Sequence, residues 1–154
     1  MIASLAAAVA LNIMSPPRPM ETALLKGVEA CHGHAFDNLE TTEFLRSAGF
    51  VPVIQTEFEY DWRWRGDGYE IQAWSNMFAC GSTVIRGRLS DRDAVRIVRP
   101  WAQRHGYQPP RDASEQEALL YMMLKRDEGF DMAVGRDDAG QIRVTMAPGY
   151  FTDS

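Results

Sequence analysis

The chain has 154 residues, of which 45% are hydrophobic and 24% are charged, and its net charge at pH 7 is −5. This length fits one domain of ordinary size, and the apolar fraction excludes an intrinsically disordered chain. The negative charge disfavours nucleic acid as a partner, and no apolar run reaches the roughly 20 residues that a membrane-spanning helix needs.

Residues 1–14 form a short apolar run without an acidic residue. Its length suits the apolar region of a signal peptide, residues 8–10 (Ala-Val-Ala) match a small-x-small cleavage pattern, and the prolines of 15–19 end any helix. No basic residue precedes the run, so a docked N-terminal helix of a cytoplasmic protein is the alternative. We expect a signal peptide and Pro-rich linker over 1–19, followed by a single exported domain, periplasmic or secreted, over 20–154.

The first predicted element of this domain is a helix from Met20 to Cys31. Its apolar residues recur at spacings of four, four and three, so they share one face that includes Cys31. Cys80 lies in an apolar stretch, 78–85, that predicts a buried strand. Two core-facing cysteines on different elements of an exported chain predict a Cys31–Cys80 disulfide, and two separate buried thiols are the alternative.

The strongest pattern is an alternation from Ile54 to Trp64, with mostly apolar or aromatic residues at even positions and polar residues at odd positions. It predicts one long strand with a buried face, which includes Phe58, and a wet face. Residues 65–68 predict a four-residue turn into a second strand. The resulting cross-strand pairs are Trp64 with Tyr69, Arg63 with Glu70, Trp62 with Ile71 and Asp61 with Gln72.

Three further helices are predicted from their end signals. A short helix over 41–48 is ended by Gly49, where a left-handed residue is often needed. A helix capped by Ser90 runs to Arg104. A capping box begins another helix, over 115–125, which is apolar nearly all round and therefore predicted to be buried.

A final hairpin is predicted from two alternating segments separated by turn residues at 137–140. It places Met132 and Val134 across from Ile142, Val144 and Met146. The complete order is α-α-β-β-β-α-α-β-β. This order predicts an α+β fold, with an antiparallel sheet of about five strands and helices packed on one face.

Two groups of residues are candidates for chemistry, each with a simpler structural interpretation. Cys31, His32 and His34 are weak candidates for a metal site, although a spacing of two points the histidines in different directions on a helix. Glu57 and Glu59 lie on the wet strand face at a spacing that acid–base carboxylates can use, as a hydrolase would. A polar strand face and solvated histidines explain both groups without a function, and no cofactor is expected.

The aromatic residues Trp62, Trp64 and Tyr69 gather at the end of the predicted hairpin. A strand as long as 54–64 would extend beyond the core of a small domain, so these side chains could form an exposed interaction tip. The sequence favours a small, exported, non-catalytic domain that binds a protein or envelope component. The hydrolase using Glu57 and Glu59, and the metal-binding protein, are the alternatives.

Overall fold

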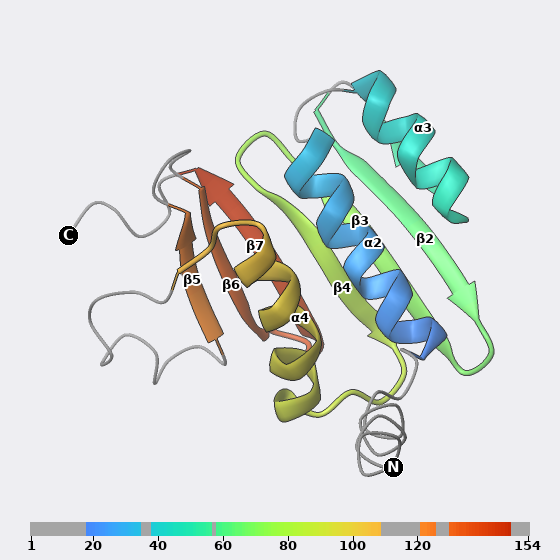
Figure 1. Ribbon diagram of the computed structural model, residues 1–154. Helices are drawn as coiled ribbons and strands as arrows, with labels where there is room; N and C mark the ends of the chain where they lie inside the picture. Colours follow the sequence, from blue (N-terminus) through green and yellow to red (C-terminus); the bar gives the residue numbers. More distant parts are fainter. Residues whose placement is uncertain (1–17, 35–37, 57, 109–120, 126–129, 149–154) are drawn as a thin grey trace, which may run out of the picture.

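The computed structural model describes residues 18–34, 38–56, 58–108, 121–125 and 130–148 (Figure 1). The helices of this part are α2 (Pro19–His34), α3 (Asn38–Ala48) and α4 (Asp91–Arg104). Its strands are β1 (Val51–Gln55), β2 (Tyr60–Gly66), β3 (Tyr69–Ser75), β4 (Cys80–Arg86), β5 (Tyr121–Lys125), β6 (Phe130–Arg136) and β7 (Ile142–Pro148). The predicted signal peptide lies outside the described residues.

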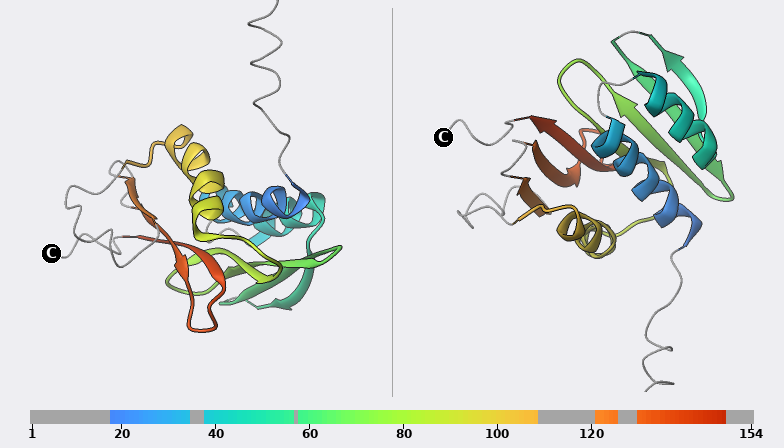
Figure 2. Two further views of the ribbon diagram at one scale, coloured as in Figure 1. Left: turned by 90° about the horizontal axis from the view of Figure 1, so that it is seen from below. Right: turned by 45° about the horizontal axis from the view of Figure 1, so that its top comes forward.

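The strands form one sheet in the order β1-β2-β3-β4-β7-β6-β5, and every neighbouring pair is antiparallel. The helices of the described part lie on one face of this sheet (Figures 1 and 2). The predicted α+β class, antiparallel sheet and one-sided helical layer are therefore confirmed. The sheet has seven strands in the described residues, where about five were expected.

The sheet is built from two consecutive units that follow one plan. Helix α2 precedes the meander β2–β4, and helix α4 precedes the meander β5–β7. The last strands of the two units, β4 and β7, pair with each other at the centre of the sheet. Helix α3 and strand β1 are inserted after α2, so β1 forms one edge of the sheet.

The segment from Ile54 to Trp64 is not one strand, as the alternation predicts, but parts of β1 and β2 joined by a tight turn. Thr56 Oγ1 accepts hydrogen bonds from the backbone N–H groups of Phe58 (3.3 Å) and Glu59 (3.0 Å), and the Thr56 N–H donates to the Glu59 carbonyl (2.9 Å). Threonine suits a strand, but its hydroxyl can also close a turn, and the hydrophobic pattern does not separate the two. Phe58 is 58% exposed and not in the core.

The β2–β3 hairpin closes with a two-residue loop, Asp67-Gly68, and not with the predicted four residues. Trp64 therefore pairs with Ile71, Trp62 with Ala73, Arg63 with Gln72 and Asp61 with Trp74. Gly68 supplies a positive φ of 77° in this loop. The register differs from the expected one by two residues, so each side chain keeps its predicted face of the sheet.

Residues 121–125 form strand β5, which pairs with β6, where a helix was predicted. A short apolar run does not distinguish a buried helix from a strand, and pairing with β6 decides the outcome. The remainder of that predicted helix, residues 115–120, lies outside the described residues. The final hairpin is confirmed, since Met132 pairs with Met146 and Val134 with Val144.

The helix ends follow their sequence signals. Ser90 caps α4 and accepts a hydrogen bond from the Asp93 N–H at 3.1 Å. Gly49 has a φ of 105° after α3, and the Phe50 N–H donates to the Leu45 carbonyl at 2.9 Å. Both ends match the predicted caps.

The hydrophobic core lies between the helices and the sheet. Its fully buried large side chains are Trp62, Leu24, Leu45, Ile71, Met132, Met146, Val28, Val98, Val134 and Val144. Gly27 allows α2 to approach β4 closely, because a Cβ at this position would collide with the Ser82 side chain. In contrast to the core strands, every residue of the edge strand β1 is exposed, including Pro52, which pairs with Trp62.

Candidate functional site

Cys31 and Cys80 form the predicted disulfide, which joins α2 to the first residue of β4. Their Cα atoms are 5.5 Å apart, and both residues are buried. A sulfur in a disulfide is neither a thiolate ligand nor a nucleophile. The metal-binding interpretation of Cys31, His32 and His34 therefore loses its thiolate.

The histidines take part in aromatic packing between α2 and α4. His32 Nδ1 and the Tyr107 hydroxyl share a hydrogen bond of 3.2 Å, and the His32 ring meets the His105 ring edge-on at 5.0 Å. His105 stacks on Trp101 at 4.0 Å. The side chain of His34 lies outside the described residues. Within the described part of the chain, no group of three or more potential ligands could hold a metal ion.

One member of the carboxylate pair of the hydrolase alternative, Glu59, does not lie on a strand. Glu59 is exposed and belongs to the turn between β1 and β2. Glu57 lies outside the described residues. The described residues therefore show an exposed Glu59, and the arrangement of the two carboxylates remains a prediction.

The predicted interaction tip, formed by Trp62, Trp64 and Tyr69, is not an exposed surface. Trp62 is completely buried in the core, and Trp64 and Tyr69 are half-buried against it. The Trp64 ring meets the Phe50 ring edge-on at 5.4 Å. The reason is that the chain directly after α3 lies against this end of the hairpin, where Gly49 is also next to the Trp64 ring.

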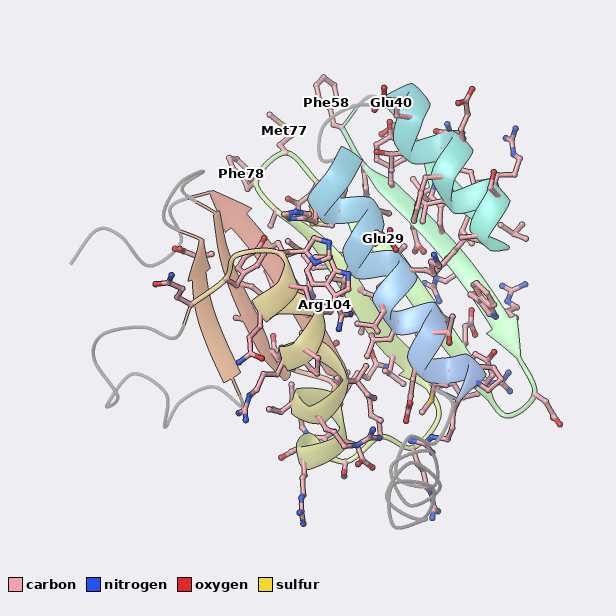
Figure 3. The ribbon with its side chains drawn as sticks, in the orientation of Figure 1. Glu29, Glu40, Phe58, Met77, Phe78 and Arg104 are labelled. Atoms are coloured by element: carbon pink, nitrogen blue, oxygen red, sulfur yellow. A yellow bond between two sulfur atoms is a disulfide. The ribbon has the colours of Figure 1, made fainter. Side chains whose placement is uncertain are left out.

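Exposed apolar side chains gather instead at the opposite end of β2 and β3. Phe58, Met77 and Phe78 are 58%, 61% and 78% exposed, and we call them the apolar tip (Figure 3). Phe58 belongs to the β1–β2 turn, and the other two belong to the β3–β4 turn. Alternate turns of an antiparallel meander lie at the same end of the sheet, so the three side chains share one end of the molecule.

The two turns of the apolar tip are built alike. Asn76 Oδ1 accepts hydrogen bonds from the Phe78 and Ala79 N–H groups, both at 2.8 Å, and the Asn76 N–H donates to the Ala79 carbonyl at 2.9 Å. Thr56 makes the same set of bonds around Phe58. In each turn a side-chain oxygen fixes the backbone two residues ahead, where a phenylalanine stands. This spacing, a turn-forming side chain two residues before Phe, is the sequence signal that would have identified the tip.

Acidic residues lie beside the apolar tip. Glu59 follows Phe58 directly, and Glu40 is an exposed residue at the start of α3 (Figure 3). The Gln55 side-chain amide donates to Thr42 Oγ1 at 3.0 Å, which ties this first part of α3 to the end of β1. The tip is therefore apolar at its centre and negatively charged on the side of α3.

The face of the sheet opposite the helices carries a network of ion pairs. Arg63 binds Asp61 through two hydrogen bonds of 2.6 and 2.9 Å, and Arg63 and Arg65 both contact Glu70, at 3.2 and 3.3 Å. The hydrogen bond from Arg63 lowers the pKa of Asp61 against the opposing effect of burial, and Asp61 in turn raises the pKa of Arg63. The charges of these side chains are paired with one another, which is typical of a structural network of ion pairs.

No family model, curated protein or solved structure matches this chain. In the described residues, no helix combines the length and the apolar character that crossing a membrane requires.

Proposed function

We propose that this protein is an exported, non-catalytic domain that binds a protein partner through the apolar tip. The observation that carries the proposal is the pair of matching turns that hold Phe58 and Phe78 exposed at one end of the sheet. Large apolar side chains fixed in water without a packing role are typical of interaction anchors.

The size of the apolar tip suits the centre of an interface. With about 200 Å² for each fully exposed large side chain, the three residues present roughly 400 Å² of surface. Large apolar residues such as these are the usual anchors of protein interfaces. The hydrogen bonds of Thr56 and Asn76 restrict the turns before binding, which reduces the entropy that a partner has to overcome.

The charge around the tip indicates the chemistry of the partner. The exposed Glu59 directly follows Phe58, on a chain of net charge −5. A partner with an apolar pocket and basic residues beside it complements this arrangement. An anionic lipid surface, or a second copy of the same tip, would meet it with like charge.

Export is supported by two independent features. The Cys31–Cys80 disulfide is stable in oxidising compartments such as the periplasm or the extracellular medium, and rare in the cytoplasm. The apolar run over 1–14 has the length of a signal-peptide core.

Site-specific photo-crosslinking in cells of the native host tests the proposal. A photoreactive phenylalanine analogue at position 78 should yield a discrete crosslinked protein in the extracytoplasmic fraction. Phe58→Ser in the same chain should remove most of that product, because both turns contact the partner. The matched control places the analogue at Arg104, an exposed residue of α4 (Figure 3).

Three results would contradict the proposal. The first is the same product from position 104 as from position 78. The second is a product that consists solely of two copies of this chain. The third is a crosslinked protein found exclusively in the cytoplasmic fraction, which would refute export but retain the binding surface.

A further inference from the structure

A groove of about 410 Å³ lies on the face of the sheet opposite the helices and reaches the β3–β4 turn, whose Asn76 and Ala79 belong to its lining. Its lining includes Trp74, Asn76, Ala133, Arg143 and Thr145. The strand residues among these alternate with neighbours such as Ala73 and Val144, which belong to the core beneath the helices. Small residues at this point, Ala133 among them, leave the floor of the groove open.

Trp74 and Arg143 are brought together by the sheet register. Trp74 pairs with Gly81 on β4, and Gly81 pairs with Thr145 on β7. Because Gly81 has no side chain, the indole lies over its Cα, with a ring carbon 3.0 Å from where a Cβ would be. The guanidinium of Arg143 then stacks on the indole, 4.0 Å from its centroid.

Arg143 differs from the other arginines on this face. Arg63 and Arg65 are paired with carboxylates, whereas no carboxylate of the described residues forms an ion pair with Arg143. The side chain is half-buried, and its guanidinium carbon is held over the indole ring of Trp74. A guanidinium carries a planar fork of N–H donors, which can bind a carboxylate through two parallel hydrogen bonds.

The neighbouring polar groups add hydrogen-bond donors. Asn76 uses its side-chain oxygen within the β3–β4 turn, which leaves its NH₂ group for a ligand. The Thr145 hydroxyl has no hydrogen-bond partner among the described residues, and the buried indole N–H of Trp74 has none either. A half-buried cation surrounded by donors favours a ligand that supplies acceptors.

The groove also contains negative charge. Asp137 and Asp138 belong to its lining, and Asp137 accepts hydrogen bonds from the N–H groups of Ala139 and Gln141 within the β6–β7 turn. Arg136 is paired with Asp91 and does not offset them. This charge disfavours a ligand with several negative groups and favours one with a single carboxylate.

We propose that the groove binds a small ligand or a chain end that carries one carboxylate, with the carboxylate on Arg143 and its remaining acceptors toward Asn76 and Thr145. Both N-acetylated amino acids and the C-terminus of a peptide provide this chemistry. The groove adjoins the apolar tip at Asn76, but the carboxylate contact on Arg143 does not depend on the proposed function.

NMR titration of the ¹⁵N-labelled full chain tests the site through the tryptophan indole signals. Trp74→Phe identifies the Trp74 signal. N-acetylalanine is expected to shift this signal saturably, and its C-terminal amide is expected to leave it unchanged, because the amide lacks the charge. An N-acetylated tetra-alanine that binds more tightly than N-acetylalanine would identify a chain end as the source, and equal affinities would identify a small carboxylate.

The variants separate recognition from folding. Arg143→Gln should weaken N-acetylalanine binding by at least tenfold, and Arg143→Lys should weaken it less, because lysine keeps the charge but loses the planar fork. Arg104→Gln removes the same charge from α4 and should leave the affinity unchanged. The indole signal of the buried Trp62 reports whether each variant is folded.

Equal shifts with N-acetylalanine and its amide would overturn the proposal. So would unchanged affinity in Arg143→Gln, or a loss in Arg104→Gln as large as the loss in Arg143→Gln. If Arg143→Gln does not fold, Arg143→Lys together with the amide comparison still decides the matter.

Discussion

Phe58 and Ile71 are large apolar residues in the same half of the sheet, and they differ in exposure. Ile71 is completely buried, and Phe58 is 58% exposed. We expect Ile71→Ala to lower the free energy of unfolding by about 2–5 kcal/mol, because it leaves a cavity in the core. Phe58→Ala should change it by at most about 0.5 kcal/mol, as substitutions of exposed residues generally do. Urea denaturation at neutral pH measures both.

A Phe58→Ala variant as unstable as Ile71→Ala would mean that the β1–β2 turn packs within the core. The apolar tip would then have a structural role, and its exposure would not indicate binding. Val53→Ala, an exposed residue of the neighbouring strand β1, serves as the control and should also be close to neutral.

The sequence correctly predicts the burial of single residues that lie within a continuous helix or strand. Cys31 and Val28 follow a helical spacing, and Trp62 follows a strand alternation, and all three are buried. The same alternation fails at Phe58, because a turn that preserves the polar–apolar order looks like a strand in the hydrophobic pattern. The hydroxyl of Thr56 decides between the two, through hydrogen bonds that a pattern of polarity does not contain.

Helix α2 depends on one glycine for its distance from the sheet. A Cβ at Gly27 would meet the side chain of Ser82 and lie 3.5 Å from the Cβ of Ala73. We expect Gly27→Ala to lower the free energy of unfolding by about 1–3 kcal/mol, because α2 or β4 must shift to admit the methyl group. The midpoint of urea denaturation, with an unchanged slope, measures this effect.

The compensating variant identifies the contact that is responsible. Ser82→Gly combined with Gly27→Ala should recover much of the lost stability, because the methyl group then occupies the space of the serine side chain. Strictly additive effects of the two substitutions would show that they do not share this space. An increase in stability in Gly27→Ala alone would show that helix propensity outweighs the close approach.

At the level of elements, the sequence predicts most reliably those with explicit end signals. Ser90 and Gly49 mark helix ends that the structure confirms. The apolar segment over 121–125 has no internal signal of this kind, and it becomes β5 because β6 offers backbone partners. The register of β2 and β3 also depends on the loop Asp67-Gly68, whose length the turn residues alone leave open.

For the whole molecule, the disulfide connects the helical layer to the middle of the sheet. Cys31 and Cys80 are 49 residues apart in the sequence. The loop-entropy relation gives about 4 kcal/mol of stabilisation for a loop of this length. We expect a reducing agent to lower the urea midpoint accordingly, and Cys31→Ser with Cys80→Ser to match the reduced protein.

The state of the cysteines in the cell can be measured directly. Protein recovered from the native host, denatured and alkylated without reduction, should show no modified cysteine in its intact mass. Alkylation of both cysteines under these conditions would refute a disulfide in the cell. It would also remove the main structural support for export.

The binding surfaces are properties of the whole molecule, and the sequence predicts them poorly. The Cys31–Cys80 disulfide could be predicted from the sequence, because both residues lie at positions predicted to face the core and the chain has no other cysteine. Trp74 and Arg143 come together because β4 and β7 are neighbours and Gly81 separates them. Predicting this contact requires the order and register of the strands, and neither follows from the local sequence.

The edge strand β1 has a consequence for how the protein behaves at high concentration. Pro52 lies opposite Trp62, and Trp62 directs its backbone groups toward β3, so the nitrogen of Pro52 is on the outer side of β1. An incoming strand from another molecule would meet a proline where it needs a hydrogen-bond donor, and fibril growth from this edge is hindered. This edge can therefore keep Val51, Val53 and Ile54 in contact with water while hindering the addition of a further strand.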